Sequence, residues 1–269
     1  MQARRRRSQG WKPVQHGAWF MLALPVFTGA TLRLREGPLP SHVWWLAACW
    51  VAGYLCFQAA TILAKSPPAR RAAFRPALFT YAALTIVFGL ATLASGGLAV
   101  LGWLVAFAPL VAGALVLAAG RRDRSLGSGA LTVAIASLMT LVTRFDSPQQ
   151  LAAVLGSPAA TTALAATGLV FAYLFGTVLY VKTMIRQRGD ARWRAASAGW
   201  HASATLATVP AVIDGVLGWA WPAFFLTTLA RALAMPVIAL RRPVRPMTVG
   251  LVEIVFSVAF ALLVPVATG

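Results

Sequence analysis

The sequence predicts an all-α membrane protein in which about nine transmembrane helices form a polytopic bundle. Of its 269 residues, 59% are hydrophobic and only 11% are charged, and the mean hydropathy is +0.74. Soluble domains carry about 25% charged residues, so too little polar surface remains here to cover a water-exposed globule. Apolar stretches also recur along the chain at close to the ~20 residues that cross a ~30 Å hydrocarbon core.

Nine apolar stretches are expected to form these helices. The stretch at 197–215 is the most polar, because Pro210, Asp214 and three hydroxyl side chains interrupt it. The first and fifth stretches are short. The expected spans are residues 16–33, 43–64, 77–95, 98–119, 127–144, 159–182, 197–215, 219–240 and 248–267.

The distribution of basic residues predicts the orientation of the chain. Twenty of the 24 Lys and Arg residues fall in the N-terminal segment and in alternate connections, whereas the other connections hold only Arg33, Arg35 and Arg144. Cytoplasmic loops carry the excess of Lys and Arg, so the N-terminus is expected inside and, after nine spans, the C-terminus outside. We therefore expect a basic cytoplasmic segment at 1–15 and a single transmembrane helical domain at 16–269.

Several other classes of protein and site are not expected. The net charge of +18 is interspersed between apolar stretches, whereas a nucleic-acid binder gathers its basic residues on one soluble face. Cys49 and Cys56 are seven residues apart on one stretch, about 10 Å along a helix and beyond the reach of a disulfide. The chain has no zinc-protease motif, no P-loop, no serine-hydrolase motif and no paired carboxylates for Mg²⁺, so we expect neither a metal site nor a cofactor.

Arg231 and Glu253 are oppositely charged residues inside neighbouring expected spans, and they are expected to pair. Arg231 and Glu253 lie on successive antiparallel helices, about 13 Å and about 9 Å from the same membrane surface at 1.5 Å per residue. A buried charge in a membrane needs a partner, so an Arg231–Glu253 ion pair is predicted. Such a pair either belongs to a functional site or only fixes the register of the two helices.

Other polar side chains from several helices fall in the same half of the membrane. They suggest a basic cavity that opens to the cytoplasm, where Arg and Lys favour phosphate, diphosphate or carboxylate groups. The alternative is that these cations follow the ordinary positive-inside bias and contact anionic lipid at the surface. The candidate ligand-binding residues are Gln15, His16, Gln58, Tyr180, Lys182, Arg186, His201, Arg231 and Glu253.

Several segments resemble a known family. The segment from Lys12 to Pro25, KPVQHGAWFMLALP, is similar to the opening motif of the YwiC-like bacterial membrane proteins. Phe175–Arg186, FGTVLYVKTMIR, resembles their second signature. Arg231 with Pro236, and Val252–Ile254, resemble their closing section. The resemblance covers about residues 12–267. It implies a multi-pass protein of the bacterial cytoplasmic membrane and no established activity.

A second, more distant likeness is to the UbiA-type intramembrane prenyltransferases. They share the nine helices with the N-terminus inside, a first helix with proline, and a segment such as Phe74–Pro76 after the second helix. Those enzymes hold Mg²⁺ and a prenyl diphosphate with two aspartate-rich motifs. Here the first motif position, Gln58–Lys65, has no aspartate, and the second retains only Asp190. The resemblance therefore implies a related fold rather than Mg²⁺-dependent prenyl transfer.

The leading hypothesis is an integral membrane protein that binds an anionic lipid or isoprenoid phosphate in a cytoplasm-facing cationic cavity. In it, His16, Lys182, Arg186 and Arg231 contact the headgroup, and Glu253 orients Arg231. The alternatives are a diverged UbiA-like transferase that lacks the Mg²⁺ motifs, and a transporter or membrane assembly factor. Whether the chain is an enzyme stays open, as do its protein partners. The expected partners are the bilayer and the anionic lipids of its cytoplasmic face.

Overall fold

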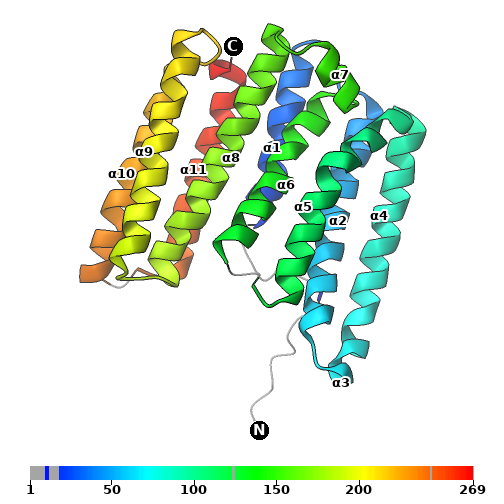
Figure 1. Cartoon of the computed structure of the whole chain (residues 1–269), viewed down its shortest axis with the longest axis horizontal. Coiled ribbons are helices and arrows are strands. Elements are labelled where there is room, and N and C mark those ends of the chain that lie inside the picture. Colours follow the sequence, from blue (N-terminus) through cyan, green and yellow to red (C-terminus); the bar gives the residue numbers. More distant parts are fainter. Residues whose placement is uncertain (1–9, 12–17, 123–124, 243, 269) are drawn as a thin grey trace. The chain divides into compact units, whose positions relative to one another are not determined.

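The computed structural model describes residues 10–11, 18–122, 125–242 and 244–268, and these residues are mostly helical (Figure 1). The chain divides into two compact units. The first unit comprises residues 1–18 and 38–132, and the second comprises residues 19–37 and 133–269. Gln15 and His16 lie outside the described residues, as does most of the basic N-terminal segment.

The first unit is built around one long helical hairpin. Its two arms, α2 and α4, pack along each other, and α5 contacts α2. Prolines occupy the first turns of α3 and α4, where the missing N–H is not needed and the fixed φ favours a helix start. The elements are α2 Ser41–Lys65, α3 Pro68–Arg71, η1 Ala72–Phe74, α4 Arg75–Gly96, η2 Leu98–Trp103 and α5 Leu104–Ala119.

Small residues allow α2 and α4 to approach closely. A Cβ on Gly96 would lie 2.7 Å from the ring and 2.9 Å from the Cβ of His42, which is buried against this glycine. Gly89 lies seven residues before Gly96 on α4. A Cβ added to Gly89 would lie at an ordinary contact distance from the sulfur of Cys49. Helices in lipid associate through such small-residue contacts, because the hydrophobic effect does not distinguish a neighbouring helix from lipid chains.

The second unit contains a four-helix bundle formed by α8 to α11. Each helix packs on the next, α11 packs back on α8, and α8 also contacts α10 across the bundle. Ser157 and Asp190 accept backbone N–H bonds at the starts of α8 and α9. The first residues of α1 and α6 belong to the first unit, and the rest of both helices belongs to the second. The elements of the second unit are α1 Ala18–Leu34, α6 Leu126–Arg144, α7 Pro148–Ala153, α8 Pro158–Ile185, α9 Ala191–Ile213, α10 Ala220–Arg241 and α11 Pro246–Ala267.

Stacked aromatic rings fill the bundle away from the α8–α9 turn. Trp221 of α10 meets Phe260 of α11 edge to face, with 4.8 Å between ring centroids, and Tyr173 of α8 lies 5.2 Å from the same ring. Trp221, Tyr173 and Phe260 are all at most 2% exposed. Aromatic pairs in these geometries add about 0.5–1.5 kcal/mol each beyond area burial, so they hold α8, α10 and α11 together.

Each of the nine predicted stretches contains a helix. Among the described residues, seven helical segments are long and apolar enough to cross a membrane. The other two are α1, which has 17 residues, and α9, which is the most polar of the predicted spans. The structure thus confirms a multi-pass α-helical protein and supports seven of the expected spans by length and composition.

The contact at Gly96 can be tested with a matched glycine on the same helix. Gly96→Ala should lower the free energy of unfolding by about 1–3 kcal/mol, because the new methyl group collides with the Cβ of His42. Gly89→Ala places its methyl group at an ordinary distance and should be neutral or slightly stabilising. Thermal unfolding of the two purified variants distinguishes them, and equal melting temperatures would refute the close contact.

Candidate functional site

A buried ion pair lies inside the four-helix bundle. The Nη1 of Arg231 on α10 donates to Oε1 of Glu253 on α11, and their side chains are only 4% and 10% exposed. The other oxygen of Glu253, Oε2, accepts a 2.8 Å hydrogen bond from the hydroxyl of Thr177 on α8. The ion pair predicted from the depths of the two residues is therefore confirmed, and a third helix takes part in it.

Two aromatic rings cover the guanidinium of Arg231. Its Cζ lies 4.3 Å from the ring centroid of Tyr180 on α8 and 4.4 Å from that of Phe256 on α11. Each such cation–π contact contributes about 1–2 kcal/mol where water is excluded. Arg231 therefore meets one carboxylate and two rings, which fixes the orientation of its side chain.

Some polar atoms around this pair are not satisfied. Within the part of the chain that the structure describes, the Nε and Nη2 of Arg231 are buried without a hydrogen-bond partner, and so is the hydroxyl of Tyr180. By contrast, the hydroxyl of Tyr173 shares a 2.9 Å hydrogen bond with that of Ser257. Buried polar groups without a partner cost about 1–3 kcal/mol each, so these three atoms are the ones around the pair whose burial is not compensated within the described residues.

His201 of α9 is buried against a glycine of α8. Its Nδ1 lies 2.7 Å from the backbone oxygen of Ser197, which can only accept, so Nδ1 carries the hydrogen. The Nε2 then lies 3.0 Å from the position that a Cβ of Gly176 would take. The ring is 3% exposed and packs α9 on α8, which makes His201 part of the helix interface.

Basic side chains crowd one end of the bundle, where the α8–α9 and α10–α11 connections lie together at the lower left of Figure 1. Lys182 places its Nζ 4.9 Å above the ring of Trp193. The one carboxylate in these two segments, Asp190, accepts from the backbone N–H of Arg192 and caps α9. We call this surface the basic end; its members are Lys182, Arg186, Arg188, Arg192, Arg194, Arg241, Arg242 and Arg245.

The predicted site residues divide into three groups. The second unit brings Tyr180, Arg231 and Glu253 into contact and holds His201 on the neighbouring helix. Lys182 and Arg186 belong to the basic end. Gln58 lies on α2 in the first unit, and Gln15 and His16 lie outside the described residues, so their place in one site remains a prediction.

The sequence interpretation missed a set of ion pairs at the opposite end of the second unit. Arg33 at the end of α1 binds Asp146 with two hydrogen bonds of 2.7 and 3.1 Å, and Arg144 at the end of α6 binds Glu36. In the sequence, Arg33, Arg35 and Arg144 predict only the orientation of the chain, and no partners are assigned to them. The signal was present, because two of the six acidic residues stand within three positions of these arginines.

A third arginine at that opposite end closes a helix terminus. Arg35 donates to the backbone oxygens of Thr268 at 2.5 Å and of Pro265 at 3.0 Å, at the end of α11. The indole nitrogen of Trp221 donates to the oxygen of Ala267 at 2.9 Å. The last carbonyls of a helix have no partner within the helix, so these donors satisfy groups that the helix itself leaves unpaired.

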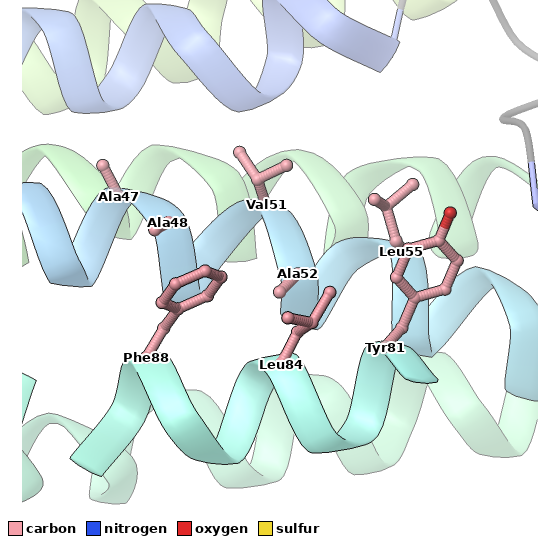
Figure 2. Close-up of a pocket in the computed structure, with 8 residues that line it drawn as sticks. All are labelled: Ala47, Ala48, Val51, Ala52, Leu55, Tyr81, Leu84 and Phe88. Carbon is pink, nitrogen blue, oxygen red and sulfur yellow. The ribbon is translucent and has the colours of Figure 1, made fainter. Parts of the chain in front are cut away.

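A groove in the first unit has a different chemistry. It holds about 450 Å³ and lies between α2 and α4, lined by Val51 and Leu55 from one helix and Leu84 and Phe88 from the other (Figure 2). The hydroxyl of Tyr81, which also lines it, donates to the backbone oxygen of Trp11. The groove contains none of the nine predicted site residues, and its apolar walls suit a hydrocarbon chain rather than a charged headgroup.

Two tyrosines of α8 offer a test of the buried polar groups. Tyr173→Phe removes a hydroxyl that is bonded to Ser257, and it should lower the free energy of unfolding by about 1–2 kcal/mol. Tyr180→Phe removes a hydroxyl for which the described residues provide no partner, and it should leave the stability unchanged or raise it. The two variants are compared by chemical unfolding in micelles; a larger loss for Tyr180→Phe would contradict this assignment.

Comparison with known proteins finds one family that part of the chain resembles. Residues 13–144 match the model of the family described as YwiC-like protein. The matched residues include nearly all of the opening motif and end before Phe175, so the second signature lies outside them. The curated proteins and the solved structures give no match. Residues 13–144, just under half of the chain, are thus similar to the YwiC-like protein family.

Proposed function

We propose that this membrane protein binds an anionic amphiphile, a lipid or isoprenoid phosphate, at the basic end of its four-helix bundle. The observation that supports the proposal is the charge of that surface. Eight cations gather on two adjacent connections, and the single carboxylate among them is engaged in capping α9. Arg and Lys bind phosphate oxygens with charge-assisted hydrogen bonds, which are about twice as strong as neutral ones.

Lys182 and Arg186 are the proposed headgroup contacts. Lys182 is half-buried and packs on the ring of Trp193, so its ammonium group is held in place rather than mobile in solvent. Arg186 follows at the end of α8 and is exposed, so its guanidinium is accessible to a phosphate. Further inside, Arg231 with Glu253, and Tyr180 and His201 beside them, form the proposed inner part of the same site.

The proposal includes an orientation in the membrane. The basic end is taken to face the cytoplasm, where anionic lipids supply the ligand and attract juxtamembrane cations by about 1 kcal/mol each. α1 and α9 complete nine crossings in this arrangement, with the N-terminus inside and the C-terminus outside, in a bacterial cytoplasmic membrane. The 17 residues of α1 span about 25 Å, which is short but close to the hydrocarbon thickness.

The test is binding of phosphatidic acid to the detergent-purified protein, measured by native mass spectrometry. The wild type should retain one phosphatidic acid and no phosphatidylcholine under the same conditions. Lys182→Ala, Arg186→Ala should weaken the binding by about tenfold or more, because two charge-assisted bonds to the headgroup are lost. The matched control is Arg70→Ala, Arg75→Ala, which removes the same charge from exposed residues of the first unit and should bind as the wild type does.

Two results would contradict the proposal. A wild type that retains no phosphatidic acid would remove the basis for a ligand site. An equal loss of binding in the test and control variants would show that any cationic surface attracts the lipid, as the positive-inside bias alone predicts.

A further inference from the structure

We propose that the free edge of the Arg231 guanidinium is a buried binding site for an oxyanion, the phosphate or carboxylate of a guest molecule. The inference extends the proposed function, because it names an inner contact for the same class of ligand. It depends on other residues than the basic end, however, so the two can fail separately.

The geometry of the guanidinium leaves one edge without a hydrogen-bond partner among the described residues. Glu253 uses only Nη1, and the rings of Tyr180 and Phe256 lie over the guanidinium at 4.3 and 4.4 Å. Nε and Nη2 remain, both buried and both without a hydrogen-bond partner among the residues that the structure describes. Arg231 as a whole is 6% exposed, so bulk water does not satisfy them.

Nε and Nη2 are the two guanidinium nitrogens that can bind one oxyanion together. In a planar guanidinium, the hydrogen of Nε and one hydrogen of Nη2 point in the same direction, about as far apart as the two oxygens of a carboxylate or phosphate. This is the edge that binds such groups with two parallel hydrogen bonds. The unpaired edge therefore has the donor arrangement of an oxyanion site, which a single water molecule would satisfy less completely. Because both nitrogens are covered by neighbouring atoms, a guest reaches them only when those neighbours move.

Two hydrogen bonds to Glu253 keep its carboxylate away from the Nε and Nη2 edge of Arg231. The hydroxyl of Thr177 donates to Oε2 of Glu253 while Oε1 accepts from Arg231, so the carboxylate is tied at both oxygens. Glu253 consequently stays at the Nη1 side and does not rotate across to form a bidentate pair. Thr177 of α8 thus keeps the carboxylate of Glu253 away from Nε and Nη2 of Arg231.

Charge sets the strength of the site. Glu253 already balances Arg231, so an incoming oxyanion is attracted by one positive charge and repelled by one negative charge nearby. Binding to the wild type should therefore be weak. Replacing Glu253 by the isosteric glutamine keeps an acceptor for Arg231 and removes the repulsion, so it should tighten oxyanion binding.

The experiment is a thermal-unfolding titration of the full-length protein in micelles. One arm uses inorganic phosphate and the other uses the short-chain lipid dihexanoyl phosphatidic acid, each against sodium chloride at matched ionic strength. A ligand that binds only the folded protein raises the melting temperature as its concentration exceeds its Kd. A shift with both probes indicates that a free oxyanion suffices, and a shift with the lipid alone indicates a lipid headgroup as its source.

Two variants decide whether the site is the edge of Arg231. Arg231→Lys keeps a positive charge for Glu253 but has no second parallel donor, so the shift should disappear. Glu253→Gln should lower the Kd by about tenfold, and it decides the matter on its own if Arg231→Lys does not fold. The proposal is overturned if neither probe stabilises the wild type, in which case water fills the edge. It is also overturned if Arg231→Lys responds like the wild type or if Glu253→Gln binds no more tightly.

The outcome does not depend on the test of the basic end. Loss of the phosphate response in Arg231→Lys, with Lys182→Ala, Arg186→Ala still responding, would support the inner site alone. Loss of phosphatidic acid in Lys182→Ala, Arg186→Ala, with no effect of Arg231→Lys in either arm, would support the basic end alone and overturn the inner site.

Discussion

The rest of the second unit depends on one constraint: a charged pair in an apolar bundle must be satisfied by the helices around it. Arg231 and Glu253 are each about nine-tenths buried, and removal of either leaves an uncompensated charge. Thr177, Tyr180 and Phe256 complete their surroundings from α8 and α11. Since these contacts work at only one rotation and depth of each helix, the pair fixes how α8, α10 and α11 meet.

The two ends of the second unit differ in how their charges are balanced. At one end, Arg33 and Arg144 each meet a carboxylate, and Arg35 meets the last carbonyls of α11. These contacts of Arg33, Arg35 and Arg144 stabilise the fold. At the basic end, the cations greatly outnumber the carboxylates, so this end is the one with positive charge to spare for a ligand.

The sequence predicted the helices and the central pair because both depend on position along the chain. Hydropathy marks a stretch that can cross a membrane, and a rise of 1.5 Å per residue places Arg231 level with Glu253.

The rotation of a helix about its own axis is not predicted by these two rules. Lipid-facing and bundle-facing side chains are both apolar, so the sequence placed Tyr180 in the same candidate site as Arg231 but did not identify Phe256 or Thr177 as contacts. The division of the chain into two units is also not indicated by its composition, because both units consist of apolar helices. The pairing of Arg33 with Asp146 joins residues 113 positions apart, which a single sequence does not relate.

The most direct test of this account is a double-mutant cycle on the central pair, with Arg231→Met, Glu253→Met and the double variant. Free energies of unfolding are measured in mixed micelles. Each single replacement should cost about 3–5 kcal/mol, because it strands a buried charge. The double replacement should cost less than the sum by about 2 kcal/mol or more, since it removes both charges at once. Additive costs, or single replacements that change the stability by less than about 0.5 kcal/mol, would contradict the claim that this pair organises the bundle.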